Sequence, residues 1–94
     1  MLSHTDIIRL RRWVMGLGGK IIFIFKETPY RLTIGKFIHA EDEDGKTVDW
    51  SKAFGTQLPH QVLSTYQIEQ ITVKLREGER VFKNLTELLR RVGK

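Results

Sequence analysis

Residues 20–26 read KIIFIFK, and this stretch sets the architecture that we predict for the whole chain. Five apolar residues, all branched or aromatic, follow one another between two lysines. Glycines precede the stretch, and Thr28-Pro29 follows it. A run of this length and composition is typical of a strand that is buried on both faces. We therefore expect a sheet in which this strand lies near the centre.

The residues after this strand predict a bent second strand and then a hairpin. Apolar residues alternate over 30–34, Gly35 interrupts them, and the apolar pattern resumes at Phe37. A glycine that shifts the alternation within a strand indicates a bulge or a sharp bend. Asp44-Gly45, at the end of an acidic run, predicts a hairpin turn into residues 46–50, because a type I′ turn needs positive φ at its centre.

Each end of the chain predicts a helix. Ile7, Leu10 and Val14 share one helical face, Ser3 with Asp6 forms a capping-box-like start, and the glycines at 16, 18 and 19 end the helix. Near the other end, Asn84 is a helix cap, and four apolar residues follow at helical spacing: Leu85, Leu88, Leu89 and Val92.

Two further strands are predicted between the hairpin and the last helix. Residues 71–75 alternate between apolar and polar, and Glu77-Gly78 offers a turn into residues 80–83. Residues 51–65 have no sustained period, and a loop of this length is often functional or contains a short helical turn. The expected fold is α+β and forms a single domain over residues 1–94. It has an N-terminal helix, a curled five-stranded antiparallel sheet or small partly closed barrel, and a C-terminal helix.

Composition and spacing argue against several classes of function. The chain has 94 residues and no cysteine, so neither a disulfide framework nor a thiolate metal site is expected, and we expect a cytoplasmic protein. The longest apolar run has five residues, too few for a membrane span or an export signal.

Catalytic and cofactor motifs are also missing. The three histidines (His4, His39 and His60) lack metal-ligand spacing, and a triad written from Ser64, His60 and Asp49 lacks the GxSxG motif. The glycines at 16–19 precede a strand and follow a helix, the reverse of a phosphate-binding loop. The acidic run does not fit a calcium loop, because Ala40 and Ser51 would occupy the first and last ligand positions. We expect no catalysis, no metal and no cofactor.

Charge is the remaining functional signal. The net charge is +5, and two basic ends enclose an acidic middle. Residues 1–36 hold seven Lys or Arg and two Asp or Glu. Residues 37–69 hold two basic and six acidic residues, and residues 70–94 hold seven basic and three acidic residues. A surface with such separated charge favours acidic partners.

The first functional hypothesis is a small basic module that binds RNA or DNA through the first helix and the start of the second strand. Arginine and lysine neutralise phosphates, and aromatic rings stack on bases. The residues expected to contact phosphate are Arg9, Arg11, Arg12, Lys20, Arg31 and Lys36. Trp13 or Tyr30 is expected to stack on a base.

The alternative hypothesis is a protein-interaction or assembly module. The acidic hairpin over residues 41–49 of one copy would dock against the basic ends of another copy and so form a homo-oligomer. A solvated helix face is the ordinary role of surface arginines, and both hypotheses compete with it.

Overall fold

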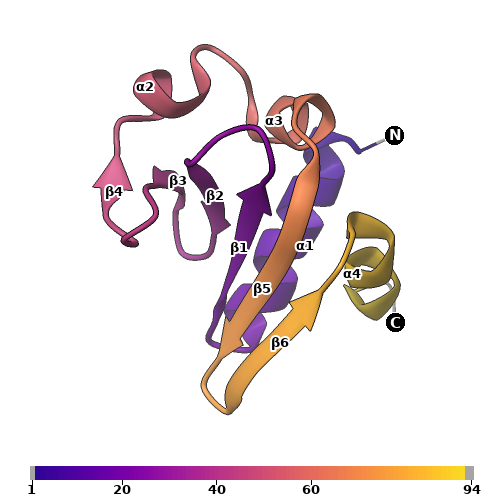
Figure 1. Ribbon diagram of the computed structural model, residues 1–94. Coiled ribbons are helices and arrows are strands. Elements are labelled where there is room, and N and C mark those ends of the chain that lie inside the picture. Colours follow the sequence, from indigo (N-terminus) through magenta and orange to yellow (C-terminus); the bar gives the residue numbers. More distant parts are fainter. Residues whose placement is uncertain (1, 93–94) are drawn as a thin grey trace.

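The computed structural model describes residues 2–92 and has an α+β fold with one antiparallel sheet (Figure 1). Its first half contains α1 (His4–Gly16), β1 (Lys20–Phe25), β2 (Arg31–Ile34), β3 (Ile38–Glu41) and β4 (Thr47–Val48). Two short helices, α2 (Trp50–Phe54) and α3 (Pro59–Thr65), then lead back to the sheet. The last elements are β5 (Ile68–Leu75), β6 (Gly78–Phe82) and α4 (Leu85–Val92). Within residues 2–92, no helix is long and apolar enough to cross a membrane.

The strand order is β4-β3-β2-β1-β5-β6, so β1 lies in the middle of the sheet, as its apolar run predicted. Both neighbours of β1 are antiparallel to it, and Ile22 lies opposite Thr33 of β2 and Thr72 of β5. Ile21, Ile22 and Phe23 are buried, which agrees with a strand that has little exposure on either face.

The prediction of a single bent strand over residues 30–38 is wrong. Gly35 lies instead in a tight turn between β2 and β3, where Ile34 pairs with Ile38 and the Gly35 amide donates to the Phe37 carbonyl. The sheet of residues 2–92 therefore has six strands, not five. It also stays open, because β4 and β6 are opposite edges that do not pair with each other, so no barrel forms.

The predicted hairpin at Asp44-Gly45 is confirmed between β3 and β4, but its turn is not of the expected type I′, because Asp44 does not have a positive φ. The Asp42 amide donates to the Lys46 carbonyl, and Gly45 has a φ of 81°, in the region that favours glycine. The Asp42 carboxylate accepts from the amides of Asp44 and Lys46, which fixes the tip of the hairpin.

One face of the sheet forms the core together with all four helices, and Figure 1 shows α1 running behind β1 and β5. Fully burying a Leu, Ile or Phe side chain contributes about 1.5–3 kcal/mol, so this face provides most of the drive for folding. The core residues from the helices are Ile7, Leu10, Val14, Phe54, Val62, Leu63 and Leu88. Those from the strands are Ile21, Phe23, Phe25, Leu32, Ile34, Ala40, Ile71 and Val73.

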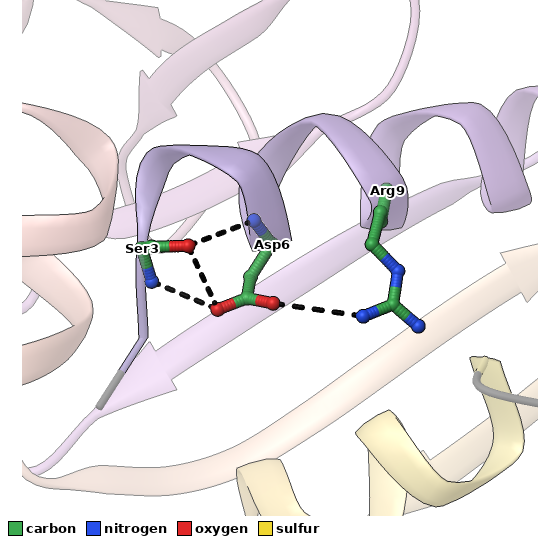
Figure 2. A network of polar contacts seen from close by, with 3 residues as sticks. All are labelled: Ser3, Asp6 and Arg9. Carbon is green, nitrogen blue, oxygen red and sulfur yellow. Dashed lines mark hydrogen bonds and ion pairs between the residues drawn. The ribbon is translucent and has the colours of Figure 1, made fainter.

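The start of α1 has the predicted capping box (Figure 2). The Asp6 amide donates to the Ser3 hydroxyl, and the Asp6 carboxylate accepts from the Ser3 amide at 2.9 Å. The hydrogen bonds from the Ser3 backbone amide and hydroxyl, with a smaller contribution from Arg9, lower the pKa of Asp6. The helix ends at Gly16, as its glycines predicted.

Residues 51–65, expected to form a functional loop or to contain a short helical turn, contain most of α2 and all of α3. Phe54 of α2 packs edge-on against Phe25 and Trp50, and the Trp50 indole donates to the Gln57 carbonyl at 2.9 Å. The final helix is confirmed: Asn84 accepts from the Glu87 amide, and Leu88 is fully buried.

The opposite face of the sheet contributes none of the core side chains. Strand alternation and register place on it Lys20, Ile22 and Ile24 of β1, Arg31 and Thr33 of β2, His39 and Glu41 of β3, and Gln70, Thr72 and Lys74 of β5. We call this surface the open face. It carries the site described next.

Candidate functional site

A pocket of about 450 Å³ lies at one end of the open face, where three segments distant in sequence meet. Because neighbouring strands are antiparallel, the start of β1, the turn between β2 and β3 and the end of β5 all reach this end of the sheet. The pocket is lined by residues 18–20, 35–37 and 74–76, together with Thr33 and His39. We call it the basic pocket, for the side chains around it.

Two glycines allow these segments to approach one another. A Cβ atom on Gly19 would overlap the Lys74 carbonyl oxygen, so only glycine lets the chain enter β1 this close to β5. A Cβ atom on Gly35 would lie 3.2 Å from the Cβ of Lys20, so a side chain there would also be crowded. The pocket wall is therefore backbone at these two positions.

Four cationic side chains surround the pocket: Lys20, Lys36, Lys74 and Arg76. None of the described residues that line it is acidic. In residues 2–92 the only carboxylate within ion-pair distance of these four is Glu79, whose Oε1 lies 3.8 Å from the Lys74 Nζ. Like charges gathered with so little neutralisation produce a positive potential that attracts anions.

Phe37 adds an aromatic surface at the rim of the pocket. It is 70% exposed, more than any other large hydrophobic side chain of residues 2–92. The Lys36 Nζ lies 5.7 Å from the centre of its ring, within the range of a cation–π contact. The ring is therefore accessible to a ligand at the rim of the pocket.

Arg11 holds the turn that carries Phe37. Its Nε donates to the Gly35 carbonyl at 3.1 Å, and its Nη2 donates to the Lys36 carbonyl at 2.6 Å. These two bonds connect α1 to the β2–β3 turn across 24 and 25 residues of sequence. Arg11 thus has a structural task, and its predicted contact with phosphate stays a prediction.

His39 has a carboxylate partner beside the pocket. Its Nε2 lies 2.7 Å from a carboxylate oxygen of Glu41, and the Glu41 side chain is almost completely buried. The His39 ring thus provides a hydrogen-bond partner for the buried Glu41 carboxylate on the open face. Within residues 2–92, no group of three or more His, Asp or Glu side chains has the arrangement that a metal ion would need.

The structure separates the eight residues predicted to bind nucleic acid into three groups. Lys20 and Lys36 line the basic pocket. Tyr30 and Arg31 lie at the opposite end of the sheet, and Tyr30 is half-buried against the core. The remaining four, Arg9, Arg11, Arg12 and Trp13, belong to α1.

The α1 residues differ in their surroundings. Figure 2 shows Arg9 directed toward Asp6, whose Oδ1 lies 3.7 Å from the Arg9 Nη1. Arg12 is exposed. Trp13 is half-buried, packs against the core and lines a separate hollow with Leu17 and Arg80. Contact of these side chains with nucleic acid stays a prediction.

Sequence reasoning missed Phe37, Lys74 and Arg76 as site residues. Lys74 occupied a polar position of an alternating strand, and Arg76 preceded a turn, so neither formed a local cluster of charge. Only the pairing of β1 with β5 brings Lys74 into the cluster, because it places Lys74 directly opposite Lys20. Two lysines paired across neighbouring strands repel each other, and Glu79 partly offsets the charge of Lys74.

The residues of the hypothetical hydrolytic triad have other partners. The Ser64 hydroxyl donates to the His60 carbonyl, and the Asp49 carboxylate accepts from the Ser51 hydroxyl.

Comparisons of this chain with models of protein families, with curated proteins and with solved structures found no match.

Proposed function

We propose that this chain is a non-catalytic binding module for nucleic acid and that the basic pocket is its contact surface. The observation that supports this most is the combination of four cations with one exposed aromatic ring around a single pocket. Phosphates account for the affinity of most nucleic-acid complexes, and aromatic side chains offer a stacking surface to bases.

The proposed site moves the centre of binding away from α1. Lys20 and Lys36, from the original set of candidates, are joined by Lys74 and Arg76. Arg9 faces Asp6, and Arg11 binds two carbonyls, so these cations are less available to a ligand. The pocket is therefore the better location for the phosphates.

The experiment compares two variants of equal net charge. The pocket variant replaces Lys20, Lys36, Lys74 and Arg76 with Gln, and the control variant replaces the exposed Lys46, Lys52, Lys83 and Arg90 with Gln. Binding of a fluorescent oligonucleotide is measured at several salt concentrations. Each phosphate contact contributes about 0.7–0.9 to the slope of log affinity against log salt, so the pocket variant should lose roughly three units of slope.

The control variant should retain most of that slope, because its four cations lie outside the pocket. Equal losses in the two variants would show that only net charge matters and would contradict a localised site. No binding by the wild type at about 50 mM salt would contradict the proposal as a whole.

A second candidate function is head-to-tail assembly, favoured by the separation of charge along the open face. The end opposite the basic pocket has a hollow of about 400 Å³ lined by three carboxylates (Glu27, Glu43 and Glu69) and two cations (Lys26 and Arg31). Glu43 belongs to the predicted acidic hairpin and is exposed at its tip.

Docking of this acidic end onto the basic pocket of another copy would be a heterologous contact, which forms rings or open chains of subunits. Light scattering at low and high salt separates the two functions. Oligomers that dissociate in salt and ignore the oligonucleotide would favour assembly, and a monomer that binds the oligonucleotide would favour the first proposal.

A further inference from the structure

The interior of the basic pocket differs from its rim. The rim is cationic, whereas the remaining lining includes three glycines and the exposed Phe37. Its volume of about 450 Å³ is in the range of sites that enclose a small organic molecule. A ligand that fits both parts has a compact, largely apolar body with negative charge attached to it.

Hydrogen bonds hold the backbone of the turn that carries Phe37. Phe37 follows the two carbonyls that Arg11 binds, and its own carbonyl accepts from the Gly35 amide across the turn. The fixed backbone keeps the exposed ring at the rim of the pocket, where a planar group can stack against it. Stacking on such a ring tolerates any nucleotide sequence, because every base has a π face.

Thr33 provides the pocket with one polar group that the protein does not use. The residue is 1% exposed, and its hydroxyl oxygen has no hydrogen-bond partner in the described part of the chain. The neighbouring His39 ring is already engaged with Glu41. A hydroxyl both donates and accepts, so it suits the edge of a base, whose groups are also donors and acceptors.

We infer that the basic pocket takes one unstacked nucleobase of a single strand, with the base against Phe37 and above Thr33. Lys20, Lys36 and Arg76 bind the phosphates on either side of it. This inference rests on the proposed function and deepens it, because it names single strands as the ligand class. A base in a duplex is stacked and paired, and inserting it would require the duplex to open locally.

The test uses three probes of equal length, about 12 nucleotides: single-stranded oligo-dT, an abasic strand with the same phosphates, and a duplex. The wild type should bind oligo-dT more tightly than the abasic strand by about 5- to 100-fold, the range expected for stacking of one base. The duplex carries more phosphates but keeps its bases stacked and paired, so its affinity should not depend on the Phe37 ring.

Phe37→Ala should remove the preference for oligo-dT and leave binding of the abasic strand unchanged. Val81→Ala is the matched control, because Val81 is a 59% exposed side chain outside the pocket, and it should retain the preference. Both replaced side chains are exposed, so unchanged thermal unfolding is expected and is measured alongside binding.

Thr33→Val, which keeps the shape and removes the hydroxyl, should reduce differences in affinity among oligo-dT, oligo-dC and oligo-dA. Unchanged differences would overturn the role given to Thr33. Equal affinity of the wild type for oligo-dT and the abasic strand would overturn the inference and leave the proposed function standing. Failure to bind any of the three probes would overturn the proposed function itself.

Discussion

The two ends of the open face have the same architecture and opposite chemistry. At the basic pocket, three segments place four cations around a hollow whose lining contains no carboxylate among the described residues. At the other end, Lys26 and Arg31 line a hollow of similar size with three glutamates. One of these, Glu27, also accepts a hydrogen bond from the Gln67 amide and so contributes to the fold.

The difference shows that a count of cations does not locate a binding surface. Arg31 and Lys36 both belong to the basic N-terminal third of the sequence, yet only Lys36 lies where its charge is not offset by nearby carboxylates. Attraction of a polyanion depends on the summed field of the neighbouring groups, which the fold determines.

The largest effect is expected at Gly19, where β1 meets β5 at the basic end. Gly19→Ala forces a Cβ atom onto the Lys74 carbonyl oxygen and should destabilise the protein by about 3 kcal/mol, with loss of oligonucleotide binding. Urea unfolding measures the change. Gly16→Ala is the control, because a Cβ atom there has no neighbour within 4 Å, and it should be neutral or stabilising. Equal stability of the two variants would contradict the close approach of these strands.

A smaller effect is expected at Arg11, which supports the basic end from α1. Arg11→Gln removes two charge-assisted hydrogen bonds to the β2–β3 turn and should cost about 2 kcal/mol. Arg12→Gln, at an exposed neighbour, should change stability by less than about 0.5 kcal/mol. Thermal unfolding of both variants checks this, and an equal response would mean that Arg11 is also only a surface charge.

At the acidic end, the turn at Gly45 should affect stability without affecting binding. Gly45→Ala places a side chain at a φ of 81° and should cost about 1 kcal/mol. No atom lies within 4 Å of the new Cβ, so the cost arises from backbone strain alone. Oligonucleotide affinity of the folded variant should equal that of the wild type, and a marked loss would show that the hairpin belongs to the binding surface.

The smallest effect concerns Asp6, in the first turn of α1. Because folding lowers its pKa, the ionised carboxylate stabilises the folded state above the ordinary pKa of aspartate, and this contribution is lost as the pH falls through the lowered value. The urea midpoints of the wild type and Asp6→Asn should therefore differ more at pH 7 than at about pH 2. A constant difference would show that the charge of Asp6 is not what matters.

Local patterns in the sequence predicted most of the elements. The run over residues 20–26 predicted a central strand, and the spacing of Leu85, Leu88 and Val92 predicted the last helix, because burial of one face imposes these periods. The turn at Gly35 was missed, because a glycine that breaks alternation is compatible with a bulge and with a tight hairpin alike. Helices α2 and α3 were missed because five and seven residues are too few to show a period.

The site was less accessible from sequence than the fold. Lys20 and Lys36 were identified from local charge, but Lys74 and Arg76 enter the pocket only through pairing of β1 with β5. This pairing joins residues that are 43 to 54 positions apart in the sequence, and no local pattern specifies it. Phe37 continued the apolar pattern of the expected strand, so its exposure followed only from the turn in which it lies.

The most direct test of the central claim is an NMR titration of the labelled protein with single-stranded oligo-dT, followed through the backbone amides. Binding at the basic pocket predicts the largest shift changes in residues 18–20, 35–37 and 74–76, with residues 26–31 and the hairpin tip at 43–45 unaffected. Largest changes over the exposed side of α1, or an even spread over both ends of the open face, would contradict the claim that the basic pocket is the binding surface.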